Sequence, residues 1–303
     1  MGRRPGRSER GSVLILAALA TTAVMGFAAI SIDAGRLYAV RQRLVDVCDA
    51  AALAAAQELP DDPATAEQVA REFLERNGVD PALATITVSH GGSRLGVTIA
   101  RPTATTFAGA LDVDSVQVGA ASMVEVGSTG AISGAAPLGA EMTSFEIGES
   151  YVLKVGSGEG SYHGNFHALS LGGHGACHYR STIISGYSGV VRVGDEIETE
   201  PGNMQGPTLQ GLRTRYDQDP LATFESVSSD SPRILRVPIV SSFTDCYGRD
   251  MVRVLGFGAF FMDERPSGGD VRGRFMGLLV EAEIAPGGSD YGLRAFRFIP
   301  PES

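Results

Sequence analysis

The chain has 303 residues, of which 43% are hydrophobic and 20% are charged, so it has the composition of a folded protein and the length of about two domains. Its formal net charge is −10 at pH 7, and an acidic chain repels the phosphate backbone of nucleic acids. We therefore expect no nucleic-acid partner.

The first feature in chain order is an uncharged apolar run behind a cluster of arginines. Residues 1–11 contain four arginines and one acidic residue, and the 21 residues from Ser12 to Ile32 carry no charge. A helix of that length spans the roughly 30 Å hydrocarbon core of a bilayer. Because positive charge resists translocation, we predict a single-pass protein of the cell membrane, with a cytoplasmic tail over 1–11, a transmembrane helix over 12–32 and an extracytoplasmic remainder.

Two other interpretations of the apolar run are a cleaved signal peptide and a buried core helix. The run is longer than the apolar part of a typical signal peptide, and no clean small-x-small cleavage site follows its end. Polar residues flank it on both sides, which disfavours a core helix. We favour the anchor, which makes the lipid bilayer the first partner, through residues 12–32.

The helical pattern continues past the apolar run, because no proline occurs between residue 11 and Pro60. Apolar residues then recur at spacings of three and four, which predicts a stalk with one narrow buried stripe: Leu37, Val40, Leu44, Val47, Ala51 and Ala54. We favour packing of this stripe on the protein's own strands over packing on a partner helix. If two stalks pair instead, Cys48 could form an intermolecular disulfide.

A second helix is predicted over Ala64–Asn77, with Val69, Phe73 and Leu74 as its apolar face and Gly78 as its stop. This helix precedes a change of period from helical spacing to alternation, which is typical of strands.

The alternating segments predict a small sheet. Ile86–Val88 and Leu95–Ile99 form a predicted hairpin around Gly91-Gly92, Thr106–Leu111 is a short apolar segment, and Val116–Val126 is a long strand. Residues 33–127 thus predict one long helix packed on a small sheet, a pilin-like arrangement.

A flexible linker is predicted over 128–137, within the small and nearly uncharged stretch Gly127–Pro137. Residues 138–303 show no useful helical period from Phe145 onward and predict a mostly antiparallel β-sandwich or barrel. Its expected strands are 150–155, 190–193, 234–240, 252–261, 275–283 and 293–299. The predicted fold class of the whole chain is α+β.

The N-terminal block resembles the TadE/TadG-like proteins of the tight-adherence (Flp-type) pilus machinery. Its residues 10–56 combine a Gly-Ser start, an apolar helix, the exit Asp33-x-Gly35-Arg36 and the stalk motif Asp49-Ala-Ala-Ala, with Cys48 where a small residue is usual. The strand region through Val126 fits as well. The resemblance implies a pilus-assembly role, with other pilus-assembly or pilin-like proteins contacted through the stalk and self-association as a further expectation.

The chain departs from prepilins of this machinery at one informative position. Prepilins cut by the prepilin peptidase carry a Glu five residues after the cleavage-site Gly, whereas Leu16 follows Gly11 at that distance. The resemblance therefore favours an unprocessed, TadG-like protein. Some TadG proteins also carry a von Willebrand A-type domain with an Asp-x-Ser-x-Ser metal site, and this sequence has no such motif.

Histidines gather in the second half of the chain. Two pairs, His163/His167 and His174/His178, have i, i+4 spacing, and Cys177 lies beside the last of them. That spacing suits zinc on helices, but the Gly-rich surroundings favour loops, so we expect ordinary loop histidines rather than metal ligands.

An acidic group of residues follows the histidines: Asp195, Glu196, Glu198 and Glu200. Oxygen ligands of this kind could hold calcium, but we favour a turn leading into an alternating strand with the acids in solvent. Two cysteines of the same region, Cys177 and Cys246, could form a disulfide in an oxidising compartment if their Cα atoms are close enough.

The leading hypothesis is a membrane-anchored structural or assembly component of a Flp/Tad-type pilus or related surface apparatus. The alternative is a tethered binding module in which residues 138–303 recognise a cell-wall polymer or an exported protein. An exported hydrolase is a third class, disfavoured because the sequence contains no G-x-S-x-G, P-loop, H-E-x-x-H or C-x-x-C motif. We predict no enzyme, no cofactor, and no catalytic, cofactor-binding or metal-ligating residue.

Overall fold

The computed structural model describes residues 10–141, 144–154, 167–244, 246, 248–268 and 270–301. The chain divides into two compact units. Unit 1 comprises Met1–Met123 with Ile299–Ser303, and unit 2 comprises Val124–Phe298. Each unit is described by itself below.

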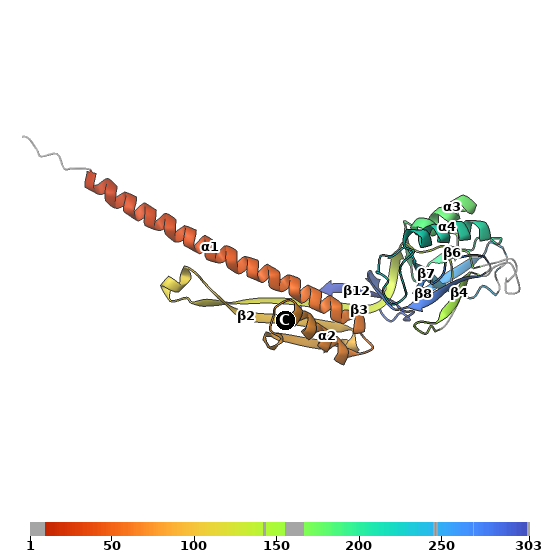
Figure 1. Ribbon diagram of the computed structural model, residues 1–303, viewed down its shortest axis with the longest axis horizontal. Helices are drawn as coiled ribbons and strands as arrows, with labels where there is room; N and C mark the ends of the chain where they lie inside the picture. The colour runs from red at the N-terminus through yellow and green to blue at the C-terminus, as the bar shows by residue number, and fades with distance from the viewer. Residues whose placement is uncertain are drawn as a thin grey trace, which may run out of the picture. The chain divides into compact units, whose positions relative to one another are not determined.

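Unit 1 is organised by one continuous helix, α1 (Arg10–Ala55), of 46 residues (Figure 1). The short 3₁₀ helix η1 (Ala56–Glu58) follows it directly. The predicted continuation of the apolar helix into a stalk is confirmed, and Gly35 does not interrupt it. The apolar part of α1 is long and apolar enough to cross a membrane.

The second half of α1 packs on the helix α2 (Pro63–Arg76) and on the strand β2 (Arg94–Ala104). Its buried residues are Leu44, Val47, Cys48, Ala51, Ala52 and Ala55. The stripe packs inside the chain, as expected, but on the helix α2 as well as on the strand β2, and it is wider than predicted. It also ends on Ala55 rather than Ala54, which is half-buried, because a straight α-helix turns every 3.6 residues rather than every 3.5.

The helix α2 begins and ends with ordinary capping signals. The Asp62 carboxylate accepts a hydrogen bond from the Thr65 amide (3.0 Å), Pro63 occupies the first turn, and Gly78 follows with a φ of 73°. The predicted apolar face of this helix was partly wrong. Small side chains that approach α1 closely form the buried centre, Ala66 and Ala70 with Leu74, whereas Val69 and Phe73 are half-buried.

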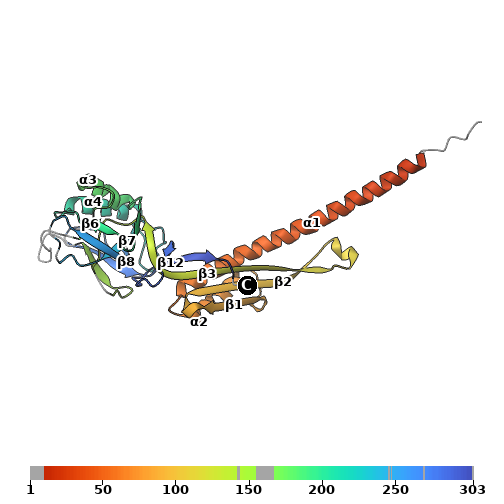
Figure 2. The same ribbon diagram turned by 180° about the vertical axis from the view of Figure 1, so that it is seen from behind.

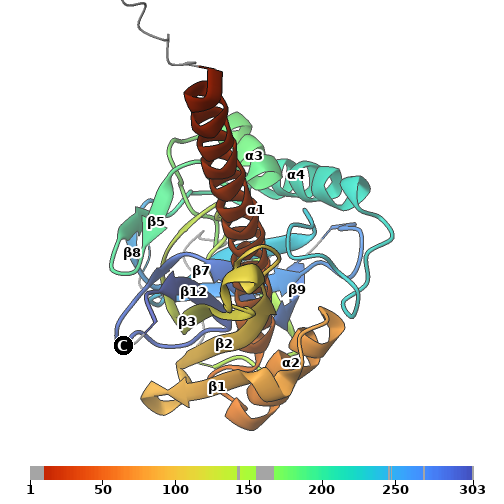
Figure 3. The same ribbon diagram turned by 90° about the vertical axis from the view of Figure 1, so that its left-hand side faces the viewer.

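Three strands complete unit 1: β1 (Ala84–Ser89), β2 and the first part of β3 (Ser115–Ser133). Short 3₁₀ helices connect them, namely η2 (Pro81–Leu83), η3 (His90–Gly92) and η4 (Ala108–Leu111). The predicted hairpin is confirmed, since β1 and β2 pair antiparallel with Ile86 opposite Val97. In Figure 3, which looks along α1, α2 and the strands β1 and β2 gather around the helix end that is farther from the N-terminus.

The segment predicted as a flexible linker is regular strand up to Ser133, so the expectation of flexibility was wrong. Its glycines serve close packing instead. A Cβ on Gly127 would lie 2.6 Å from Ile284 Cγ2, and one on Gly130 would lie 3.1 Å from the Ala285 amide nitrogen. A glycine-rich sequence therefore marks a crowded strand here. The division of the chain into domains at 128–137 stays a prediction.

Unit 2 is built mainly from antiparallel strands. One sheet has the order β4-β9-β8-β6, with β7 also paired to β8. In unit 2, β3 pairs with β5 and β11, and β12 pairs with β10 in parallel. The strand bounds are β4 (Ser150–Lys154), β5 (Val190–Arg192), β6 (Glu196–Glu198), β7 (Ile234–Val240), β8 (Met251–Phe261), β9 (Val271–Met276), β10 (Leu278–Glu281), β11 (Glu283–Ile284) and β12 (Leu293–Ile299). The predicted α+β class with a mostly antiparallel second part is confirmed.

Two helices in unit 2 were missed from the sequence, α3 (Ala176–Ser185) and α4 (Gln205–Gln218). Neither has a purely apolar stripe, because α3 buries Thr182 and α4 buries Thr208 and Arg215. A Cβ on Gly211 would lie 2.6 Å from Ile183 Cγ2, so a helix-weakening residue is needed where the two helices approach. Figure 2 shows them side by side.

Candidate functional site: the apolar helix and its junction at Asp33

The first half of α1 exposes apolar side chains. Its large hydrophobic residues are between 54% and 74% exposed. They are Val13, Leu14, Ile15, Leu16, Leu19, Val24, Met25, Phe27, Ile30 and Ile32. Soluble proteins rarely expose so large an apolar surface, so this half of the helix needs an apolar environment from outside the chain.

Three hydroxyl groups in the described part of this half are satisfied within the helix. Thr21, Thr22 and Ser31 donate to the carbonyl oxygens four residues earlier, at 2.8, 2.9 and 2.8 Å. Such bonds remove the cost of placing a hydroxyl in a medium without water. The first half of α1 is therefore chemically suited to hydrocarbon along its length.

Asp33 ends the uncharged run and is almost fully covered, with 6% exposure. Its carboxylate accepts three backbone hydrogen bonds from the segment that joins β2 to β3: from Thr106 at 2.8 Å, Phe107 at 2.9 Å and Ala108 at 2.7 Å. These bonds, led by the one from Ala108, lower the pKa of Asp33 although burial opposes them. Asp33 thereby ties α1 to residues distant in sequence.

The other two residues of the Asp33-x-Gly35-Arg36 motif, Arg36 and Gly35, differ in what they contact. The Arg36 guanidinium donates to Thr106 Oγ1 at 2.9 Å, which adds a second link to the same segment. Nothing lies within 4 Å of a Cβ built on Gly35, so the structure gives that glycine no packing role inside the chain.

A groove of about 770 Å³ runs between α1 and this segment. One wall comes from α1 between Thr22 and Leu37, and the other comes from the segment and the start of β3. The residues of the second wall are Thr105, Phe107, Ala108, Ala110 and Val116. Most lining side chains are apolar, so the groove suits an apolar occupant.

The histidines considered as metal ligands do not converge. His163 lies outside the described residues. The His167 ring stacks on Phe243, with centroids 4.4 Å apart, and burial lowers its pKa. His178 lies on α3, where its Nε2 is 2.9 Å from the Leu171 carbonyl oxygen. Within the part of the chain that the structure describes, no group of three or more His, Cys, Asp or Glu residues could hold a metal ion.

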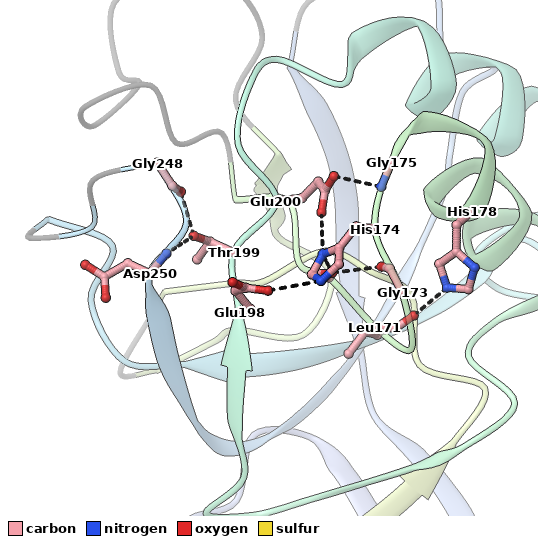
Figure 4. Close-up of polar contacts among 11 residues, drawn as sticks. Leu171, Gly173, His174, Gly175, His178, Glu198, Thr199, Glu200, Gly248 and Asp250 are labelled. Atoms are coloured by element: carbon pink, nitrogen blue, oxygen red, sulfur yellow. Dashed lines mark hydrogen bonds and ion pairs between the residues drawn. The ribbon is translucent and has the colours of Figure 1, made fainter.

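His174 lies in the loop before α3 and faces two carboxylates (Figure 4). Its Nε2 is 3.3 Å from Glu198 and its Nδ1 is 3.5 Å from Glu200. The same Nδ1 is 2.7 Å from Ser170 Oγ, and that hydroxyl donates to the Gly173 carbonyl at 2.8 Å. These contacts hold the loop before α3 in shape.

The acidic group was expected in solvent, and this is wrong for Glu200, which is 2% exposed. Its Oε1 accepts the Gly175 amide at 3.0 Å, which fixes the start of α3. Glu196 is exposed as expected and Glu198 is half-buried. Asp195 accepts the Arg192 amide at 2.8 Å, so the predicted turn is confirmed.

The three cysteines are unbridged. Cys177 is exposed whereas Cys246 is buried, so the disulfide considered between them is not formed. Cys48 is buried in the stripe that packs inside unit 1, and burial raises its pKa to about 12. It is a small core residue and does not lie on a surface available to a second stalk.

Comparison with protein-family models matches residues 11–58 to a family described as putative Flp pilus-assembly TadE/G-like. The match covers the exposed apolar half of α1, Asp33 and the buried stripe, so the resemblance read from the sequence is confirmed for this segment. Comparisons with curated proteins and with solved structures gave no match.

Sequence reasoning identified Asp33 but missed the partners of its carboxylate. The segment Thr106–Leu111 carried no signal beyond its apolar character. The one available hint was physical, since a carboxylate at the end of an apolar run needs donors if it is covered.

Proposed function

We propose that this protein is a membrane-anchored component that helps to assemble a Flp/Tad-type pilus or a related surface apparatus. One observation carries the proposal: the TadE/G-like segment, residues 11–58, coincides with a helix that is apolar and uncovered in its first half. The proposed role is structural, with the bilayer as the first partner and no catalytic step assigned to the protein.

The proposed orientation places residues 1–11 in the cytoplasm and the rest of the chain beyond Asp33 outside. Four arginines against one acidic residue support it, because basic residues next to a membrane span stay on the cytoplasmic side. Within eleven residues past Ile32 the chain carries three arginines, Arg36, Arg41 and Arg43, so the count of basic residues near the span favours the proposed orientation by one.

Other pilus-assembly proteins are the proposed protein partners of the stalk. The buried stripe is already occupied by α2 and β2, so such partners would use the outer face of α1, where Tyr38 is 70% exposed. Self-association through the same face belongs to this proposal.

The proposal is tested in cells that produce the pilus. Deleting the chain should abolish surface pili counted by electron microscopy, and the full chain should restore them. A chain whose residues 1–32 are replaced by a cleavable signal peptide should be exported and should fail to restore them. Normal pili in the deletion strain would contradict the assembly role, and rescue by the unanchored chain would contradict the need for the anchor.

A further inference from the structure

The depth of α1 in a bilayer follows from its length. Thr22 lies only eleven positions beyond Gly11, which at 1.5 Å per residue is about 17 Å and too short to cross the hydrocarbon core. If the arginines stay on one side, Thr22–Ile32 must therefore lie in the half of the bilayer nearer to Asp33. Whatever lies beside these residues lies at membrane depth.

The segment between β2 and β3 lies beside them. We call residues 105–116 the tip, which appears in yellow alongside α1 in Figure 2. Three backbone amides of the tip bind Asp33, and tip side chains share the groove with Thr22, Met25 and Ile30 of α1. The tip and the membrane-spanning half of α1 are therefore neighbours within unit 1.

The tip is built to tolerate a membrane boundary. Phe107 and Val113 are each 45% exposed and Val116 is 37% exposed, although all three are apolar. Backbone amides of the tip are largely satisfied inside unit 1, which matters where water is scarce. Seven of them donate such bonds: those of Thr105, Thr106, Phe107, Ala108, Ala110, Asp112 and Val113.

Charges restrict how deep the tip can lie. Asp112 is exposed at the tip, and a carboxylate is costly in the hydrocarbon centre. Just past the tip's attachment, Arg36, Arg43 and Arg101 line a smaller hollow of about 270 Å³. Basic side chains at that level match the position of lipid phosphates. The boundary between headgroups and acyl chains fits both observations.

We propose that the tip is a second membrane contact of this protein, lying at the headgroup–acyl boundary, and that its groove against α1 takes a phospholipid acyl chain. The inference rests on the proposed anchoring by α1 and adds a lipid-binding element to it. The groove lies at bilayer depth and has apolar walls, so an acyl chain is the occupant with matching chemistry.

The absence of tryptophan from the chain allows a direct test. A Phe107→Trp variant of the full chain, reconstituted in phosphatidylcholine vesicles, carries one fluorophore on the tip. We expect a blue-shifted emission that loses most of its intensity when the vesicles contain phosphatidylcholine with brominated acyl chains. Val113→Trp should behave in the same way, which guards against a folding defect at one position.

Two control variants distinguish membrane contact by the tip from membrane anchoring by α1. Leu16→Trp, in the apolar half of α1, should be quenched by brominated lipid if the helix spans the bilayer. Leu221→Trp, at a site 89% exposed in unit 2, should keep an aqueous emission without quenching. Quenching of the Leu16→Trp variant without quenching of either tip variant would overturn the tip proposal and leave the anchor in place.

A different occupant would give a different pattern. If a second copy of the chain covers the groove, the Phe107→Trp emission would be blue-shifted, insensitive to brominated lipid and red-shifted on dilution with excess lipid, which overturns the acyl-chain proposal. An unquenched Leu16→Trp variant would overturn the anchoring itself.

Discussion

The two halves of α1 belong to one unbroken helix and use apolar residues in opposite ways. Between Val13 and Ile32 the large apolar side chains are exposed, whereas between Leu44 and Ala55 the buried side chains are mostly small and pack against α2 and β2. Asp33 lies between the halves and is held by three backbone amides. Large residues suit a fluid lipid environment, and alanines suit a close protein contact.

The comparison shows why hydrophobicity alone does not identify a core. By mean hydropathy the first half of α1 is apolar enough to span a membrane, yet the protein's own residues leave it uncovered. What distinguishes the buried half is that its alanines face α2 and β2, which pack closely against them, whereas most alanines of the first half are exposed. A substitution in the first half should therefore impair membrane integration and leave folding intact, and a substitution in the second half should do the reverse.

The largest expected effect is on membrane integration. Leu19→Arg places a charge near the middle of the predicted span, at a cost of about 3 kcal/mol for insertion. We expect the variant to lose much of its resistance to alkaline extraction from membranes. The matched control is Tyr38→Arg, at an exposed position past Asp33 on the same helix, which should stay integrated. Full integration of the Leu19→Arg variant would contradict the assignment of the first half to lipid.

The next effect concerns the folding of unit 1. Ala52 is completely buried, so Ala52→Leu overpacks the contact of α1 with its neighbours and should lower the free energy of unfolding by about 1–3 kcal/mol. Ala18→Leu makes the same change in the exposed half and should leave the unfolding midpoint unchanged. Denaturation in detergent micelles measures both, and equal destabilisation by the two variants would remove the distinction between the halves.

A smaller, local effect is expected at Asp33. Its pKa in the folded chain lies below the ordinary value of 3.8, so its stabilising bonds are fully present above pH 3.8 and are lost as the pH falls through the lower, folded pKa. We expect hydrogen-exchange protection of the Thr106, Phe107 and Ala108 amides to fall in that acidic window.

Two variants sharpen the measurement. Asp33→Ala should remove the protection of these amides already at neutral pH. Asp46→Ala, which changes an exposed acid of α1 whose carboxylate accepts from Gln42, should leave it intact. Protection that is independent of both pH and the Asp33 side chain would show that the carboxylate does not hold the tip.

Much of the fold was predictable where one local signal dominates. The apolar run, Pro60, Gly78 and the alternating strands specify their elements through short-range chemistry, and the structure follows them. The failures occur where tertiary contacts decide. Gly127 suggested flexibility but serves close packing against Ile284, and Gly211 weakened the helical pattern of α4 for the same reason.

The candidate site was predictable only in part. The sequence located the span and Asp33, but the donors to Asp33 lie more than 70 residues away and no periodic pattern links the two segments. Likewise, Glu200 is buried with its carboxylate bound to the Gly175 amide, and the alternation of side chains along β6 does not reveal this contact.

The central claim, that α1 crosses the membrane with the arginines inside, is tested most directly with a membrane-impermeant thiol reagent. Cys177 is exposed, whereas Cys48 and Cys246 are buried. In intact spheroplasts we predict labelling of Cys177. A Ser8→Cys variant that also carries Cys177→Ser should be labelled only after the membrane is permeabilised. Protection of Cys177 in intact spheroplasts, or labelling of the Ser8→Cys variant from outside, would contradict the account.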